Sequence, residues 1–148
     1  MDTLMALRYA KSKGATIFSV CNTNGSTIGR ESDSVLYTYA GPEIAVASTK
    51  AFATQLIAMY LIALEIGKQL GHLSKKDVKS ITEQLTALPA KVEQVLETVE
   101  PLRELTRKFK DAGSILFLGR HVGYPTALEG ALKLKELAYM HAEGFAGG

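Results

Sequence analysis

Three charged residues near the end of the sequence have a spacing that could support proton transfer. Glu129, Lys133 and Glu136 stand at positions i, i+4 and i+7, which share one face of an α-helix. A lysine between two carboxylates has its basicity set by both of them, and such a cluster can move a proton at an active site. The same spacing is typical of an exposed Glu-to-Lys ion pair, so spacing suggests a site without proving one.

The helix that would carry this charged stripe (Glu129, Lys133 and Glu136) is apolar on most of its other sides. It is predicted from about Pro125 to His141, and apolar residues occupy nearly its whole circumference between Ala127 and Tyr139. A helix of this kind is expected to be buried, and a buried row of charges is costly unless it lines a polar cavity. Lys135 lies off the stripe.

A second candidate site lies where a long apolar segment begins. A helix predicted from about Ser48 to Leu70 would place the hydroxyls of Ser48 and Thr49 beside its free backbone N–H groups. The helix dipole there favours an anion or another polar ligand. An ordinary N-cap is the alternative, because Ser and Thr are common caps.

Other polar residues carry weaker signals. The run Asn22 to Ser26 could contact a sugar, although turn chemistry alone explains it. His72, His121 and His141 have no second ligand at metal-like spacing, so no metal site is predicted. The single cysteine, Cys21, excludes an intramolecular disulfide and is typical of a reducing, cytoplasmic compartment.

The elements that must position these residues alternate between helix and strand. Helical patterns cover residues 2–13, 48–70, 75–98 with a kink at Pro89, 101–110 and 125–141, and strand patterns cover 15–21, 34–39 and 114–118. The alternation predicts an α/β protein with a parallel sheet flanked by helices. Ligands bind beyond the carboxyl ends of such strands. This rule selects the loops 22–26, 41–48 and 119–123.

Composition argues against two kinds of partner. Seventeen Lys and Arg against fifteen Asp and Glu give a formal charge of +2, without a block of like charges, so no nucleic-acid surface is predicted. The most apolar stretch, Ala51 to Ile66, is interrupted by polar residues and is shorter than the roughly 20 residues of a bilayer span. We expect a buried core helix there, no membrane partner and no secretory signal.

Two long segments carry the most specific pattern. Residues 40–52 read AGPEIAVASTKAF, and the segment from Leu118 to Glu143 contains ALEGALKLKE at 127–136. Both resemble the glutamine–fructose-6-phosphate aminotransferase family, and the resemblance covers nearly the whole chain. It implies sugar isomerase (SIS) domains, in which helices wrap a flavodoxin-like parallel sheet. Residues 1–70 resemble the C-terminal half of a first SIS domain, 71–100 a helical connection and 101–148 the N-terminal part of a second.

The resemblance also implies a function and a set of site residues. Members of the family convert fructose 6-phosphate and glutamine to glucosamine 6-phosphate and glutamate without a metal or organic cofactor, and a homo-oligomer is expected. Val46 and Ser48 match residues of the fructose 6-phosphate site. Glu129, Lys133 and Glu136 match active-site residues, with Glu136 as the base that moves a proton between C1 and C2 and Lys133 assisting nearby.

Three readings of the chain stay open on this resemblance. The family's phosphate loop, Ser-x-Ser-Gly-Glu-Thr, would lie just before residue 2, and its Glu-Leu-Lys-His-Gly-Pro segment just after residue 148. The leading expectation is therefore a fragment of the isomerase region that is inactive by itself. The alternatives are a non-catalytic SIS module that binds a phosphosugar, which would not need the charged stripe, and a truncation product whose only property is partial folding or self-association.

Overall fold

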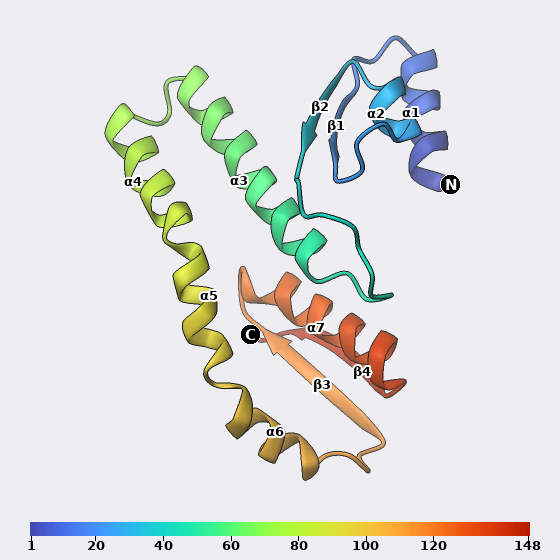
Figure 1. The fold of residues 1–148 in the computed structure, drawn as a ribbon, viewed down its shortest axis with the longest axis vertical. Helices are drawn as coiled ribbons and strands as arrows, with labels where there is room; N and C mark the ends of the chain where they lie inside the picture. The colour runs from blue at the N-terminus through green and yellow to red at the C-terminus, as the bar shows by residue number, and fades with distance from the viewer. The chain divides into compact units, whose positions relative to one another are not determined.

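Each of two units of the chain combines one short pair of parallel strands with several helices. The computed structural model describes residues 1–148, which divide into Met1–Leu85 (unit 1) and Thr86–Gly148 (unit 2). Unit 1 contains α1 (Asp2–Ser12), β1 (Phe18–Cys21), α2 (Thr27–Glu31), β2 (Ser34–Tyr37), α3 (Lys50–Gln69) and α4 (Lys75–Thr86), which ends at the unit boundary. Unit 2 contains α5 (Leu88–Leu96), α6 (Val99–Arg107), β3 (Ser114–Gly119), α7 (Gly123–Ala138) and β4 (His141–Ala146). Figure 1 shows these elements in chain order.

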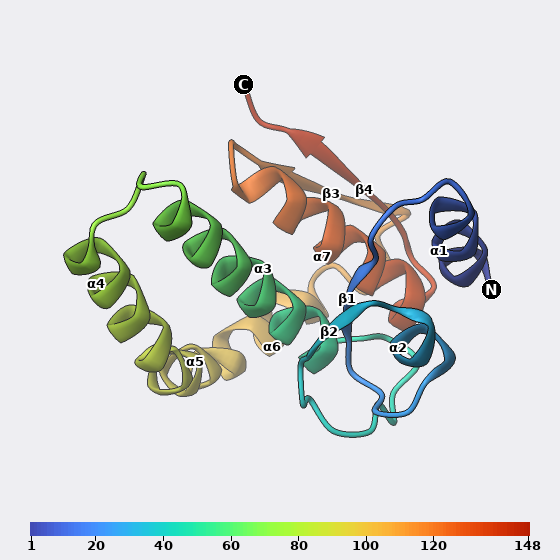
Figure 2. The same cartoon turned by 90° about the horizontal axis from the view of Figure 1, so that it is seen from above.

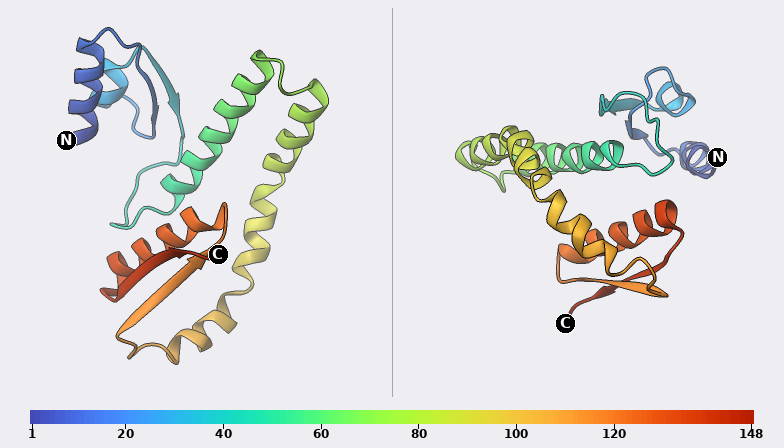
Figure 3. Two further views of the ribbon diagram at one scale, coloured as in Figure 1. Left: turned by 180° about the vertical axis from the view of Figure 1, so that it is seen from behind. Right: turned by 60° about the horizontal axis from the view of Figure 1, so that its bottom comes forward.

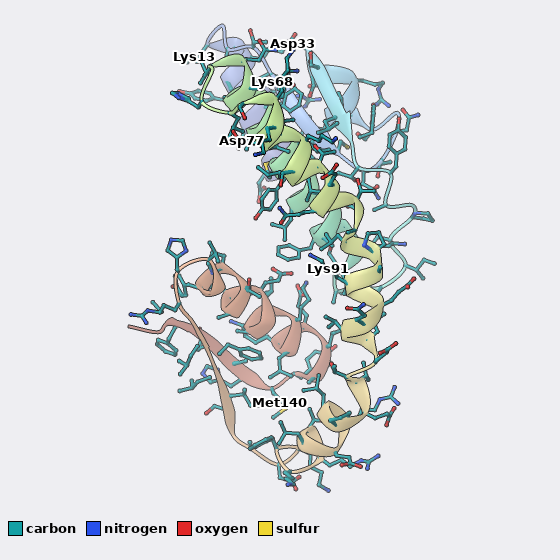
Figure 4. The ribbon with its side chains drawn as sticks, turned by 90° about the vertical axis from the view of Figure 1, so that its left-hand side faces the viewer. Lys13, Asp33, Lys68, Asp77, Lys91 and Met140 are labelled. Carbon is teal, nitrogen blue, oxygen red and sulfur yellow. The ribbon has the colours of Figure 1, made fainter.

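The sheet of unit 1 forms where the sequence is rich in β-branched and aromatic residues. β1 pairs in parallel with β2, with Phe18 opposite Ser34 and Cys21 opposite Tyr37. A polar contact joins two helices of this unit, because Arg8 of α1 donates to both carboxylate oxygens of Glu31 of α2 at 2.8 and 2.6 Å. Asp33, labelled in Figure 4, accepts a 2.8 Å hydrogen bond from the Ile17 amide at the start of β1. The parallel arrangement predicted from the alternation is confirmed.

The chain reverses between α3 and α4, as the views in Figure 3 show. Gly71 adopts a left-handed conformation, with φ of 73°, in this turn. α4 then starts with a reciprocal cap, because the Ser74 amide donates to Asp77 Oδ2 at 2.9 Å while the Asp77 amide donates to Ser74 Oγ at 3.2 Å.

The buried core helix expected over residues 51–66 is wrong for this structure. In α3 only Ala58 and Leu64 are buried, and Met59, Tyr60 and Ile66 are 49%, 58% and 53% exposed. The reason is that the elements of unit 1 pack against only part of the helix surface. α3 is also long and apolar enough to cross a membrane by length and composition, a test that core helices of soluble proteins pass as well.

After α5 and α6, unit 2 continues with a strand, a helix and a second parallel strand. β3 pairs with β4 from Ser114 opposite His141 to Gly119 opposite Ala146. α7 connects the two strands and lies along them, as Figures 1 and 2 show. Small buried side chains permit this close packing, since Ala127 and Ala131 of α7 and Ala142 of β4 are 7%, 2% and 0% exposed.

Two expectations for unit 2 differ from the structure. The final helix ends at Ala138 rather than His141, because Tyr139 turns into the left-handed region with φ of 55° and residues 141–146 pair with β3. Met140, labelled in Figure 4, lies in the short connection that follows α7. The helix is also not buried on every side, since Leu128 and Leu137 are 44% and 61% exposed. Further upstream, the pattern over residues 75–98 divides into α4 and α5, with Pro89 in the first turn of α5.

Candidate functional site

The charged stripe forms one connected cluster on α7. Lys133 Nζ donates a 2.8 Å hydrogen bond to Glu136 Oε2 and lies 3.3 Å from Glu129 Oε1. The 3.6-residue period of the helix is the direct cause, because it places residues three and four apart beside one another. The structure therefore brings the three predicted residues together, with the lysine between the two carboxylates.

The stripe is more sheltered than the chain's other ion pairs within helices. The side chains of Glu129, Lys133 and Glu136 are 23%, 21% and 34% exposed. By comparison, the side chains of Lys79 and Glu83, an i,i+4 pair on α4, are 79% and 66% exposed. An ordinary solvated pair resembles the one on α4, so the degree of shelter favours a functional role for the stripe.

Electrostatics in the stripe keep the lysine charged. The hydrogen bond to Glu136, with a further contribution from Glu129, raises the pKa of Lys133 above its ordinary value. Lys133 is therefore an ammonium group throughout the neutral pH range. It can stabilise negative charge or donate a proton, while a carboxylate is the member of the stripe that can accept one.

Lys135 takes no part in this cluster. Its Nζ lies 3.6 Å from Glu143 Oε1 on β4. The pair links α7 to the neighbouring strand, in agreement with the position of Lys135 off the stripe.

The loop that carries Val46 and Ser48 lies in unit 1, and its residues differ in their exposure to solvent. Val46 is 95% exposed, while the adjacent Ala47 is 1% exposed and anchors the loop. Ser48 is half-buried. The helix begins at Lys50, two residues later than predicted, and Thr49 at the N-cap position makes no side-chain cap hydrogen bond. The ordinary N-cap considered for Thr49 is therefore not what the structure shows.

Long-range contacts that no local pattern revealed hold this loop. Lys50 Nζ donates to the Pro42 carbonyl at 2.5 Å, and the Asn22 side chain donates to the Gly41 carbonyl at 2.7 Å. The sequence suggests Asn22 as a possible sugar contact, yet its side-chain amide forms hydrogen bonds with the chain itself. A polar residue directly after a strand is the only sequence signal that pointed to it.

The histidines are scattered among separate elements. His72 lies in the turn after α3, His121 in the loop after β3 with φ of 50°, and His141 at the start of β4. No group of three or more His, Cys, Asp or Glu side chains is arranged to hold a metal ion.

The comparisons with known proteins agree with this architecture. The family model of the SIS domain matches residues 1–65. A solved structure described as the C-terminal domain of glucosamine-fructose-6-phosphate aminotransferase from Francisella tularensis is 41% identical, with a TM-score of 0.94 over 98% of this chain and 41% of that one. A Clostridium difficile protein that is 24% identical, with a TM-score of 0.87, shares the fold alone. Residues 1–65 therefore match the SIS domain, and the chain as a whole has the fold of these structures.

Sequence similarity is higher still within one group of enzymes. Over 100% of its length the chain is 60% identical to the glutamine–fructose-6-phosphate aminotransferase (isomerizing) of Streptomyces coelicolor and 57% identical to that of Corynebacterium efficiens. It spans only 24% of the length of each of these relatives. The chain therefore corresponds to a segment of the SIS, or isomerase, region of these aminotransferases.

Proposed function

We propose that this segment supplies part of the sugar-phosphate site of an enzyme that converts fructose 6-phosphate and glutamine to glucosamine 6-phosphate and glutamate. The sheltered stripe on α7, with Lys133 hydrogen-bonded to Glu136 at 2.8 Å, is the observation that carries the proposal. The relatives of this chain are named for the same reaction. In this function ammonia from glutamine adds to the C2 ketone of the sugar, and the resulting imine isomerises to an aldose amine.

The roles of the stripe residues follow from their charges. The Glu136 carboxylate accepts the proton from C1 and returns one to C2, as general acid–base chemistry of the isomerisation requires. The Lys133 ammonium, whose pKa is raised by its carboxylate neighbours, stabilises the negative charge that develops on the sugar oxygen. Glu129, on the other side of Lys133, helps to hold the ammonium in place.

Unit 1 contributes sugar contacts in this proposal. Val46 is almost fully exposed, and Ser48 has a hydroxyl that makes no hydrogen bond within the chain, so both are free to contact a ligand. We assign residues 1–70 to the C-terminal half of a first SIS domain and 101–148 to the N-terminal part of a second. Residues 71–100 form the helical connection.

A substitution of Lys133 tests the proposal in the full-length protein that contains this segment. Lys133→Met keeps an unbranched side chain, one atom shorter, and removes its charge, so the formation of glucosamine 6-phosphate should fall by about tenfold or more. Lys79→Met is the matched control, because Lys79 also forms an i,i+4 pair but is largely exposed. The assay measures product from fructose 6-phosphate and glutamine. A wild-type protein that binds fructose 6-phosphate without turnover would instead support a non-catalytic phosphosugar-binding module.

We further propose that the protein is a cytoplasmic homo-oligomer. α3 exposes large apolar side chains, among them Leu56, Tyr60 and Ile66, and neither strand pair has partners on its outer edges. Burial of such surface stabilises association. Light scattering of the 148-residue chain should show a dimer or a larger species. A monomer that unfolds cooperatively would contradict this expectation.

A further inference from the structure

Asn22 stands at the carboxyl end of β1 and uses both ends of its side-chain amide on one neighbouring segment. Its Oδ1 accepts hydrogen bonds from the Ala40 amide at 2.8 Å and from Thr38 Oγ1 at 3.1 Å, while its Nδ2 donates to the Gly41 carbonyl at 2.7 Å. A single side chain thus satisfies groups on three of the four residues that follow β2. Such a concentration of contacts restricts the path of this segment.

The segment that Asn22 holds has a backbone path that needs support. Tyr39 lies in the left-handed region with φ of 52°, a conformation that is costly for a residue with a large side chain, and the residue is 83% exposed. Gly41 is also left-handed, with φ of 74°. The hydrogen bonds to Thr38 and Ala40 flank this strained residue, so Asn22 stabilises the turn that sends the chain toward Val46 and Ser48.

The far end of the same loop is fixed independently. Lys50, the first residue of α3, donates to the Pro42 carbonyl at 2.5 Å. Ala47, buried at 1% exposure, anchors the middle of the loop. The residues proposed to bind sugar therefore lie on a loop that is held at its start by Asn22, in its middle by Ala47 and at its end by Lys50.

We propose that Asn22 is a positioning residue for the sugar-binding loop, acting through residues 38–41 without contacting the sugar. The proposal rests on the assignment of Val46 and Ser48 to the fructose 6-phosphate site. Its consequence is that loss of the Asn22 amide weakens sugar binding more than it slows the chemical step, since the charged stripe belongs to a different element.

Kinetics of the full-length aminotransferase that contains this segment test the role. Asn22→Leu keeps the approximate shape of the side chain and removes all three hydrogen bonds. It should raise KM for fructose 6-phosphate by about tenfold, with a smaller change in kcat and none in KM for glutamine. Asn24→Leu is the matched control, because Asn24 lies in the same exposed turn and makes no hydrogen bond. Equal KM values for the two variants would overturn the proposal.

A loss of kcat at unchanged KM would also overturn it, because that pattern reports a smaller folded fraction. Asn22→Asp covers the case in which the leucine variant fails to fold. This variant keeps the acceptor for Ala40 and Thr38, but it places a carboxylate oxygen against the Gly41 carbonyl in place of the donor, so KM should remain above that of Asn24→Asp. An Asn22→Asp variant indistinguishable from Asn24→Asp would count against the role.

Amide hydrogen exchange without substrate separates this inference from the proposed function. If Asn22 positions the loop, the Ala40 amide should exchange about tenfold faster or more in Asn22→Leu than in Asn24→Leu. That result would support the positioning role of Asn22 even if the wild-type protein did not act on fructose 6-phosphate. Lack of activity on fructose 6-phosphate would refute the proposed function alone. An unchanged exchange rate of the Ala40 amide would refute the positioning role of Asn22, whatever the substrate is.

Discussion

In the proposed full-length aminotransferase, replacement of Glu136 by glutamine is expected to lower kcat by about 100-fold or more while leaving the affinity for fructose 6-phosphate nearly unchanged. The carboxamide retains the size of the side chain and an oxygen that can accept the 2.8 Å hydrogen bond from Lys133 Nζ. It cannot take up the proton from C1 or return one to C2. Steady-state kinetics with fructose 6-phosphate as the varied substrate measure both quantities.

Lys135→Gln is the internal control for this experiment. Lys135 lies one residue away on the same helix, but its charge pairs with Glu143 of β4 at 3.6 Å rather than with the stripe. The control should therefore change kcat and KM little. Small and equal effects of the two substitutions would mean that the stripe is a structural ion-pair cluster.

Gly119→Ala should destabilise unit 2 strongly, by about 3 kcal/mol. A Cβ atom at this position would lie 2.0 Å from the carbonyl oxygen of Gly123 and 2.7 Å from the Cα of Tyr124, both backbone atoms that cannot swing away. Either β3 or the first turn of α7 has to shift. Because α7 carries the charged stripe, product formation should fall together with the hydrogen-exchange protection of amides in β3 and α7.

Gly113, which directly precedes the other end of β3, supplies the comparison. A Cβ atom on Gly113 would meet nothing within 4 Å, so Gly113→Ala should leave both exchange protection and product formation close to wild type. Equal hydrogen-exchange protection in the two variants would show that β3 and α7 can move apart at Gly119 without loss of stability.

Local sequence patterns predicted the helices and strands whose conformation depends mainly on nearby residues. The strands that became β1 and β2 are rich in β-branched and aromatic residues, and the charged stripe follows from helix period alone. β4 was missed because residues 141–146 contain no β-branched residue and include Gly144. Its extended state comes from pairing with β3 over six residues, which is a long-range interaction.

The site shows the same division between local and long-range information. The residues of the stripe could be selected by spacing, but their shelter depends on how α7 packs along β3 and β4. The loop around Val46 and Ser48 could be selected by its place before a helix. Its path depends on Asn22 and Lys50, whose partners Gly41 and Pro42 are 19 and 8 residues distant in sequence, so no short pattern reveals the contacts.

The tight attachment of α7 at both ends makes this part of the chain sensitive to length. At the start, Gly119 and Gly123 are in near contact, and at the end only Tyr139 and Met140 separate the helix from β4. One residue inserted between Gly123 and Glu129 would turn the rest of the helix by about 100° relative to its anchored start. The stripe would keep its internal hydrogen bond yet face another direction. Insertions and deletions between β3 and β4 should therefore be rare among functional relatives.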